Sequence, residues 1–584
     1  MDGIRYGPPL KLYHLCINEI IAVDETSLCQ RDFRLLPSTA LSDLYERLYQ
    51  ERKLWVIYKG FNELDIFSRL LQVKGKSTFL ISSYQTLLNH GSTVTDTLLQ
   101  TFKEYVLMET MSLRVLIDTG LKMGSFLNDG GELTTEILKI LLECYKLKLY
   151  AESHYCKFTA AKDTYKAAHE VIQKLQDLKA VPHLSVIYAN FSMYHFLCSE
   201  YNESYKWAQK SISLLSNDLT KREIIEVLRQ ASKSCVVKRE FLQGGLLIRQ
   251  AMNLGEILYN KDQLPTFSNV LMDYGFYLLN SDSIGESVYV YERALNMRNS
   301  LFDRNNILIA LGHEDLAYAL YVNEYSSGHF QSAKKHAEMS IDMMELLLPK
   351  DHLMLASVKR VKALILEEMA LDERVNDKLK RDLLNTAELL HISALKLSRD
   401  NFGEKNVQTA KHYGNLGRLY QSMKQFDEAE RMHLKAIKIK EELLGPHDYE
   451  VGLSVGHLAS LYNYHMKKHK EAELLYIRSI EINIKLFGSS YSGLEYDYRG
   501  LIHVYTQLSD PYKIYEYVPK FKSNDSESEW EVEKWMFITI SQKSSPKKFA
   551  FYITYMKNRL LIKIKYCSNW NFTLFTQFKY YWIL

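Results

Sequence analysis

Apolar side chains recur at helical spacing between residues 412 and 437, where two amphipathic segments flank the short polar turn "KQFDEA". In the first segment Leu416, Leu419, Tyr420 and Met423 fall at i, i+3, i+4 and i+7, which is one face of an α-helix. In the second segment Ala429, Met432, Ala436 and Ile439 fall at i, i+3, i+7 and i+10, which also lie on one face of an α-helix. The pattern predicts two antiparallel helices, with Gly417 and the alanines where the helices approach closely.

The same pattern recurs along the chain, so this pair of helices is one unit of an array. The stretches 402–420, 444–462 and 487–505 align with one another, and their glycines Gly403, Gly445 and Gly488 are 42 and 43 residues apart. Looser copies follow the same order of small and aromatic residues over 186–212, 227–252, 270–302, 313–341 and 361–398. A fixed step of this length is the signature of a helical solenoid.

We therefore predict an all-α fold, a right-handed α-solenoid of tetratricopeptide-type helix pairs with an irregular helical N-terminal region. The step of 42 residues is longer than the usual 34 and resembles that of kinesin light chains. The predicted parts are a helical N-terminal region over 1–185, the repeat array over 186–517 and a divergent tail over 518–584 that is not part of the fold. The paired glycines Gly244 and Gly245 predict a softer unit, because glycine costs about 1 kcal/mol relative to alanine inside a helix.

Composition narrows the class of protein. Only 10 Pro and 25 Gly occur in 584 residues, which favours helices over a turn-rich β architecture. The net charge of +3 is uneven, because nine Lys or Arg and no acid follow Glu533. The mildly acidic remainder gives no electrostatic reason to expect nucleic-acid binding. Seven scattered cysteines, no signal-peptide pattern and no long apolar run predict a protein of the cytosol or nucleus.

Two short motifs resemble a phosphate-binding loop and a metal site, but each is better explained as an ordinary turn or surface segment. "GKST" at 75–78 ends like a phosphate loop, but the position of its first glycine is Leu70. His465 and His469 have the i, i+4 spacing of a helical metal pair, but no third ligand is evident. We predict no catalytic residue, no metal site and no cofactor.

The inner face of the array is the better candidate for a functional surface, because stacked helix pairs take extended peptides there. Polar positions on the first helices of the last three units form the candidate peptide-binding set, namely Lys411, Asn415, Arg418, His457, Asn463, Tyr496 and Arg499. Cations with amides suit a peptide carboxylate. The alternative is ordinary polarity on a solvated helix face.

A second candidate surface lies within 33–49, "FRLLPSTALSDLYERLY". Pro37 starts a helix there, and the apolar edge consists of Leu36, Leu41, Leu44 and Leu48. A Leu-Pro opening followed by such a helix resembles the boxes by which ubiquitin-ligase receptors bind an elongin- or Skp-type adaptor. The alternative is a helix that packs on its own domain.

Several longer stretches resemble the amyloid precursor protein-binding protein 2 family, a kinesin light chain-like group. They include "VQTAKHYGNLGRLYQSM" (407–423), "SVGHLASLYNY" (454–464), "YSGLEYDYRGLI" (491–502) and "SVKRVKALILEE" (357–368). The similarity is nearly unbroken over 186–517 and weaker over 20–185. It does not extend to the tail, since 549–584 is rich in aromatic residues and lacks acids, whereas the family ends in polar, acidic sequence.

The resemblance implies a non-catalytic adaptor, the substrate-recognition subunit of a cullin–RING E3 ubiquitin ligase. Elongin B/C would bind near 33–49, and the groove would take C-terminal degrons with an arginine before a terminal glycine. The alternative implied by the same family is a transport adaptor that links the cytoplasmic sorting tail of amyloid precursor-type membrane proteins to microtubules. Either function would place the protein in the cytoplasm, with nuclear, microtubule or membrane association left open, as is homo-oligomerisation.

Overall fold

The computed structural model describes residues 9–73, 76–108, 112–129, 135–180, 182–262, 266–324, 328–372, 375–489, 491, 493–510, 512–514 and 516–517. These residues form helices and turns, and none of them lies in a strand. The chain divides into two compact units, Met1–Asp282 and Ser283–Leu584, called unit 1 and unit 2 below. The predicted tail, 518–584, lies outside the described residues, and the predicted boundaries at 185 and 517 stay predictions.

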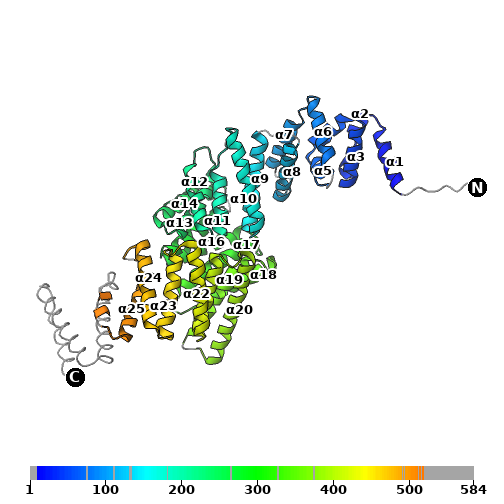
Figure 1. The fold of residues 1–584 in the computed structure, drawn as a ribbon. Coiled ribbons are helices and arrows are strands. Elements are labelled where there is room, and N and C mark those ends of the chain that lie inside the picture. Colours follow the sequence, from blue (N-terminus) through cyan, green and yellow to red (C-terminus); the bar gives the residue numbers. More distant parts are fainter. Residues whose placement is uncertain are drawn as a thin grey trace, which may run out of the picture. The chain divides into compact units, whose positions relative to one another are not determined.

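Unit 1 begins with short helices and continues with longer helix pairs (Figure 1). Its helices are α1 (Pro9–Ile21), α2 (Glu25–Cys29), η1 (Phe33–Leu35), α3 (Ser38–Gln50), α4 (Leu54–Asn62), α5 (Leu64–Leu70), α6 (Ser77–Asn89), α7 (Val94–Met108), α8 (Leu113–Asp129), α9 (Thr135–His154), α10 (Phe158–Asp177), α11 (Ser185–Leu197), α12 (Tyr201–Ser213), α13 (Lys221–Val237), α14 (Phe241–Asp262) and α15 (Thr266–Asn280).

Unit 2 consists of stacked helix pairs. Its helices are α16 (Ile284–Leu301), α17 (Ile307–Asn323), α18 (Gln331–Leu347), α19 (Met354–Leu371), α20 (Asp377–Phe402), α21 (Val407–Ser422), α22 (Phe426–Leu444), α23 (Tyr449–Ser460), the π-helical turn η2 (Leu461–His465), α24 (His469–Phe487) and α25 (Leu494–Gln507). The predicted all-α solenoid of tetratricopeptide-type pairs is thereby confirmed. In the part of the chain that the structure describes, no helix is long and apolar enough to cross a membrane.

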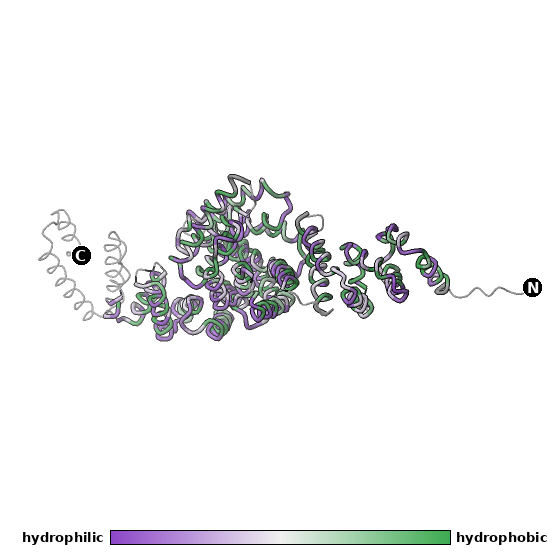
Figure 2. Tube along the Cα trace, turned by 90° about the horizontal axis from the view of Figure 1, so that it is seen from above, coloured by the Kyte–Doolittle hydropathy of each residue, from purple (hydrophilic) through white to green (hydrophobic). Residues whose placement is uncertain are grey.

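Amphipathic helices such as α10 and α22 bury an apolar stripe and expose a polar one, and green and purple segments alternate along the tube in Figure 2. Central helices such as α11 and α17 are buried on most sides. Ala429 and Ala436, the alanines predicted at close approaches, are fully buried, and so are Ala459 and Ala472 of the next unit. The repeat glycines Gly403, Gly445 and Gly488 end their helices with φ of 80°, 91° and 81°, a left-handed conformation that favours glycine.

Two helical glycines make room for neighbouring rings. A Cβ at Gly417 would lie 2.9 Å from the His433 ring, and one at Gly245 would lie 2.4 Å from the Tyr277 hydroxyl. Gly245 therefore leaves room for the Tyr277 ring. From the sequence alone, this glycine was expected only to weaken its helix.

The first helices of successive pairs lie closer together than the second helices. In unit 2, α17 contacts α19, α19 contacts α21 and α23 contacts α25. In unit 1, α9, α11, α13 and α15 contact one another in the same order. We call the surface of these first helices the inner face of each unit.

Candidate peptide-binding surface

Arg418 lies at the centre of an ionic cluster on the inner face of unit 2. Its guanidinium is 3.2 Å from Glu367 Oε2 and 3.6 Å from Glu368 Oε1 on α19, and its Nη2 donates to the Tyr321 hydroxyl at 3.3 Å. Ser422 Oγ donates to Glu367 Oε1 at 2.8 Å and so fixes that carboxylate. The Glu367 side chain is 1% exposed, whereas Arg418 keeps 29% of its side chain accessible.

The cluster holds two carboxylates and one guanidinium. Burial opposes the charge of Arg418, but Glu367, Tyr321 and Glu368 outweigh it and hold the pKa of Arg418 well above its usual value. The pKa of Glu368 is raised by burial, and the charge of Arg418 offsets this only in part. Glu368 is therefore a carboxylate that a further cation would stabilise.

Lys411 belongs to a second ionic cluster, in which cations outnumber carboxylates. Glu450 lies between two ammonium groups, with Oε1 at 3.0 Å from Lys411 Nζ and Oε2 at 2.9 Å from Lys440 Nζ. Burial raises the pKa of Glu450, but the two lysines outweigh it and hold that pKa far below its usual value. The Lys411 side chain is 34% exposed and Lys440 only 4%, so Lys411 is the cation that a ligand can reach.

Aromatic and imidazole rings continue the inner face toward α25. His457 lies 6.2 Å from the His433 ring and 6.4 Å from the Tyr496 ring, measured between centroids. Burial lowers the pKa of His457 to about 3, with His433 and Arg418 adding to the effect, so this imidazole is neutral at pH 7. Tyr496 is 50% exposed, and Asn415, between Lys411 and Arg418 on α21, is half-buried.

The remaining two predicted residues are placed differently. Asn463 is 1% exposed, and its Nδ2 donates to the Gly500 carbonyl at 3.1 Å, so it joins η2 to α25 instead of facing a ligand. Arg499 is 69% exposed at its side chain and pairs with Glu495 on the same helix. The structure thus brings Lys411, Asn415, Arg418, His457 and Tyr496 onto one face and assigns Asn463 to packing.

Comparison with known proteins gives the family. A tetratricopeptide repeat profile matches residues 409–450, which contain the Lys411 and Arg418 positions. The chain is 43% identical over 532 residues to amyloid protein-binding protein 2 of Mus musculus, covering 87% of this chain and 90% of the mouse protein. The chain belongs to this family. The Rattus norvegicus protein of the same name matches with the same identity and coverage.

These matches confirm the resemblance to the amyloid protein-binding protein 2 family that the sequence indicated. Among solved structures, the nearly identical TPR-like repeats of a Podosopora anserina protein described as a putative kinesin light chain match 38% of this chain and 98% of their own, at 15% identity and a TM-score of 0.29. The family's repeats make this chain a repeat-based protein-binding adaptor.

In this family member the N-terminal edge predicted to bind an adaptor is mostly internal. Leu41, Leu44 and Leu48 of α3 are 0%, 1% and 0% exposed, and they pack in the core of the N-terminal helices. Leu36 is half-buried against the same core, and Pro37 is exposed. The sequence assigned this edge to a surface, but an i, i+3, i+7 stripe is also what a core-facing helix shows.

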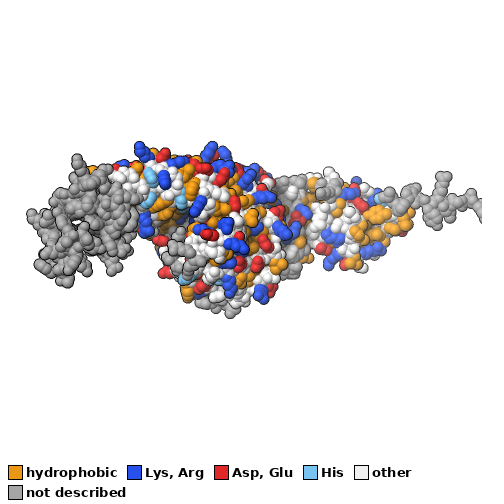
Figure 3. Space-filling model, turned by 90° about the horizontal axis from the view of Figure 1, so that it is seen from below, with side chains coloured by type: hydrophobic (Ala, Val, Ile, Leu, Met, Phe, Trp, Pro, Cys, Tyr) orange, Lys and Arg blue, Asp and Glu red, His pale blue; other side chains and the backbone are white. Residues whose placement is uncertain are grey.

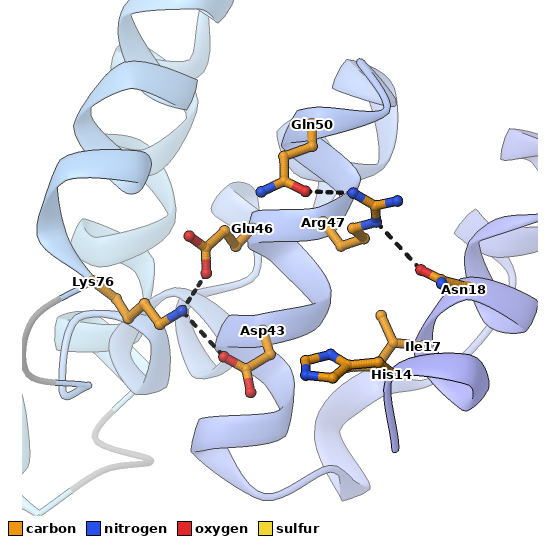
Figure 4. Close-up of a pocket in the computed structure, with 8 residues that line it drawn as sticks. All are labelled: His14, Ile17, Asn18, Asp43, Glu46, Arg47, Gln50 and Lys76. Carbon is orange, nitrogen blue, oxygen red and sulfur yellow. Dashed lines mark hydrogen bonds and ion pairs between the residues drawn. The ribbon is translucent and has the colours of Figure 1, made fainter. Parts of the chain in front are cut away.

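A pocket of about 350 Å³ lies between α1, α3 and the start of α6 (Figure 4). Lys76 bridges Asp43, at 3.2 Å, and Glu46, while Arg47 donates to Asn18 at 3.3 Å and to Gln50 at 2.6 Å. Because its ammonium is held by two carboxylates, Lys76 is poorly suited to bind phosphate. This agrees with the structural explanation of "GKST".

The sequence analysis did not predict the acidic residues of this surface. Glu367 and Glu368 lie in "ALILEEMA" (363–370), an otherwise apolar run in which two adjacent acids are unexpected. That placement was a usable signal, because carboxylates are rarely buried without partners. Among the described residues no group of three His, Cys, Asp or Glu side chains could hold a metal ion, and His465 stacks on Phe426 at 4.9 Å.

Proposed function

We propose that the inner face of unit 2 binds the C-terminal segment of partner proteins, and that the chain is the substrate-recognition subunit of a cullin–RING E3 ubiquitin ligase. The main support for this proposal is that two ionic clusters on one face carry excess charges of opposite sign. The cluster at Lys411 has an excess cation, and the cluster at Glu367 and Glu368 has an excess carboxylate. The first suits a terminal carboxylate and the second a basic side chain.

The spacing of the clusters supports the arginine-containing C-terminal degron that the family resemblance implies. Lys411 and Arg418 are two turns apart on α21, and seven residues of α-helix rise by about 10 Å. An extended peptide covers about 10 Å in three residue steps. A peptide lying along α21 can therefore place a basic residue near Glu368 and, three positions later, its terminal carboxylate near Lys411.

Recruitment of elongin B/C and the cullin is the second element of the proposal. With Leu41, Leu44 and Leu48 buried, binding would use accessible apolar side chains near this edge in the sequence, namely Leu12 and Leu15 at 68% and 58% exposure, Leu35 at 89%, and Pro37. No catalytic side chain is required, because ubiquitin transfer belongs to the partner enzymes. The compartment follows from this function and would be the cytoplasm, with the nucleus as a second site.

The second candidate function is a transport adaptor for the cytoplasmic sorting tail of amyloid precursor-type membrane proteins, with binding to microtubules. It is favoured by the name of the mouse and rat relatives, which are amyloid protein-binding proteins. A sorting tail would bind through an internal segment, whereas a degron must end in the groove. Dependence on the free carboxylate therefore separates the two functions.

The test is titration of the full chain with a labelled peptide ending Arg-x-x-Gly, with a free or an amidated C-terminus. We expect amidation to weaken binding at least tenfold, and Lys411→Ala to remove the difference between the two peptides. Lys438→Ala on α22, an exposed lysine of a second helix, is the matched control and should leave both affinities unchanged. Equal binding of the two peptides to the wild type would refute the carboxylate site and favour the transport adaptor.

A further inference from the structure

Arg360 of α19 is a guanidinium on the inner face of unit 2 that the proposed function does not use. Its Cζ lies 5.1 Å from the centre of the Tyr318 ring on α17, and that ring stacks on Tyr321 at 6.1 Å between centroids. Arg360 is half-buried, and among the described residues no carboxylate forms an ion pair with it. A guanidinium that rests on an aromatic ring and lacks an ion pair is suited to a carboxylate from outside the chain.

The other cations of α19 are directed away from this face. Lys359 Nζ donates to Ser393 Oγ on α20 at 3.3 Å, and Lys362 Nζ lies 3.3 Å from Glu338 Oε1 on α18. Both partners belong to second helices, which lie behind the inner face. Arg360 is therefore the cation that α19 contributes to the inner face.

The acidic residues of α17 do not neutralise Arg360. Glu314, one turn before Tyr318, is 8% exposed. Burial and the charge of Asp315 raise the pKa of Glu314 to about 7, although Arg360 acts in the opposite direction, so Glu314 carries only part of a charge at pH 7. Asp315 is exposed and forms no ion pair with Arg360. Neither residue supplies a full counter-charge in contact with the guanidinium.

The contacts of Glu367 fix the register of α19 against α21. Glu367 accepts from Ser422 Oγ at 2.8 Å and pairs with Arg418 at 3.2 Å. Arg360 precedes Glu367 by seven residues, as Lys411 precedes Arg418. Because the first helices of successive pairs run in the same direction, Arg360 and Lys411 lie at one level, about 10 Å toward the N-terminal ends from the contact of Glu367.

A buried imidazole supports this register. His412 follows Lys411 on α21 and is 5% exposed. Burial lowers the pKa of His412 to about 3, and the charges of Arg360 and Lys411 both add to the effect. Lys411 is directed toward Glu450 on α23, whereas Arg360 lies on the α17 side of the same level.

An extended peptide directs alternate side chains to opposite sides. With the arginine of Arg-x-x-Gly near Glu368 on α19, the next residue points toward α23, and the residue before the terminal glycine points toward α19 again. That residue lies two steps, about 7 Å, beyond the arginine. Arg360 lies about 10 Å beyond Glu367 in the same direction, and the long side chains of Arg360 and of a glutamate can meet across the remaining distance.

We propose that Arg360 is a specificity-determining residue, which selects a glutamate immediately before the terminal glycine of the bound segment. This role rests on the proposed function of unit 2 and narrows its ligand class to segments ending Arg-x-Glu-Gly. The guanidinium donates two N–H bonds to the glutamate carboxylate, and the Tyr318 ring holds the guanidinium in place. A glutamine has nearly the same shape but no charge, so it forms weaker bonds at the same position.

The test is titration of the full chain with peptides that have free C-termini and end Arg-Ala-Glu-Gly, Arg-Ala-Gln-Gly or Arg-Glu-Ala-Gly. We expect the first to bind about fivefold more tightly than the second. The third should lack this gain, because its glutamate points toward α23. Arg360→Gln should remove the preference for glutamate and leave the affinity for the glutamine peptide little changed.

Two further variants sharpen the test. Arg360→Lys keeps the charge without the planar fork and should retain part of the preference. Arg381→Gln, at an exposed arginine on the second helix α20, is the matched control and should retain all of it. Because the preference is a ratio measured within one variant, partial loss of fold or of the packing on Tyr318 would lower both affinities and leave the ratio unchanged.

Two results would overturn the role of Arg360. One is equal binding of the glutamate and glutamine peptides by a wild type that still distinguishes free from amidated C-termini, in which case the proposed function stands without it. The other is a preference for glutamate that persists undiminished in Arg360→Gln. A wild type that binds free and amidated peptides equally would refute the proposed function, and the role of Arg360 with it.

Discussion

Units 1 and 2 each place a guanidinium between carboxylates on their first helices, but only unit 1 balances the charge. Arg229 contacts Glu226 and Asp273, and Lys233 supplies the second cation. Arg418 contacts Glu367 and Glu368, and in the described part of the chain no lysine forms an ion pair with either carboxylate. The same helical scaffold therefore builds a neutral surface in one unit and an acidic position beside a basic one in the other. Figure 3 shows the wider surface, on which acidic and basic side chains are interspersed.

The largest effect should come from removing either guanidinium. Arg229→Met and Arg418→Met each leave buried carboxylates without their main cation, so each should lower the free energy of unfolding by about 3 kcal/mol. Arg431→Met on α22, whose side chain is 68% exposed, is the control and should cost less than about 0.5 kcal/mol. Chemical denaturation measures all three, and a cost near zero at Arg229 and Arg418 would show that neither cluster contributes to stability.

Acid should next weaken unit 2 more than unit 1. His391, His412 and His433 are buried, and burial lowers their pKa values, to about 3 for His412 and about 4 for His433. Above pH 6.5 both folded and unfolded chains keep these rings neutral, so the contribution of these three histidines to stability is complete there. Below pH 6.5 only the unfolded chain gains protons, and stability is lost as the pH falls toward 4.

Hydrogen exchange at pH 7 and pH 5 measures this difference by helix. We expect protection to fall in α20 and α22 before α13 and α15. His433→Gln, which cannot be protonated, should reduce the pH dependence of unit 2. Equal loss of protection in both units would contradict the assignment of acid sensitivity to the buried histidines.

Removing one carboxylate from each cluster should have a smaller effect on stability, and the effect should differ between units 1 and 2. Asp273→Asn removes a needed partner of Arg229 and Lys233, and we expect a cost of about 1.5 kcal/mol. Glu368→Gln removes the excess carboxylate of its cluster, and we expect a change within about 0.5 kcal/mol. Thermal unfolding of the two variants side by side tests this, and equal costs would mean that Glu368 is as fully paired as Asp273.

The repeat array could be predicted because its signals are local and repeated. Gly403, Gly445 and Gly488 mark helix ends by their backbone conformation, and the small residues mark contacts that recur every 42 or 43 residues. The N-terminal region has no such repetition. A leucine stripe in α3 indicates that one face is covered, but not whether the chain itself or a partner covers it.

The sequence predicted the basic residues of the candidate site but not the acidic residues that pair with them. Lys411 and Arg418 are readable as polar positions of a first helix, but their charges are set by Glu450 and by Glu367, which lie on neighbouring helices. Asn463 was mistaken for a groove residue because a π-helical turn rotates it into the contact with Gly500. Long-range pairing of this kind has no signature in periodicity.

The proposed function requires the Lys411 and Glu368 clusters to bind the two ends of one C-terminal motif. The most direct measurement is the affinity of the full chain for amidation-sensitive peptides in which one, two, three or four residues separate an arginine from the terminal glycine. We expect the tightest binding with two intervening residues, and a loss of this optimum in Glu368→Gln. Affinities that do not depend on the spacing would contradict it.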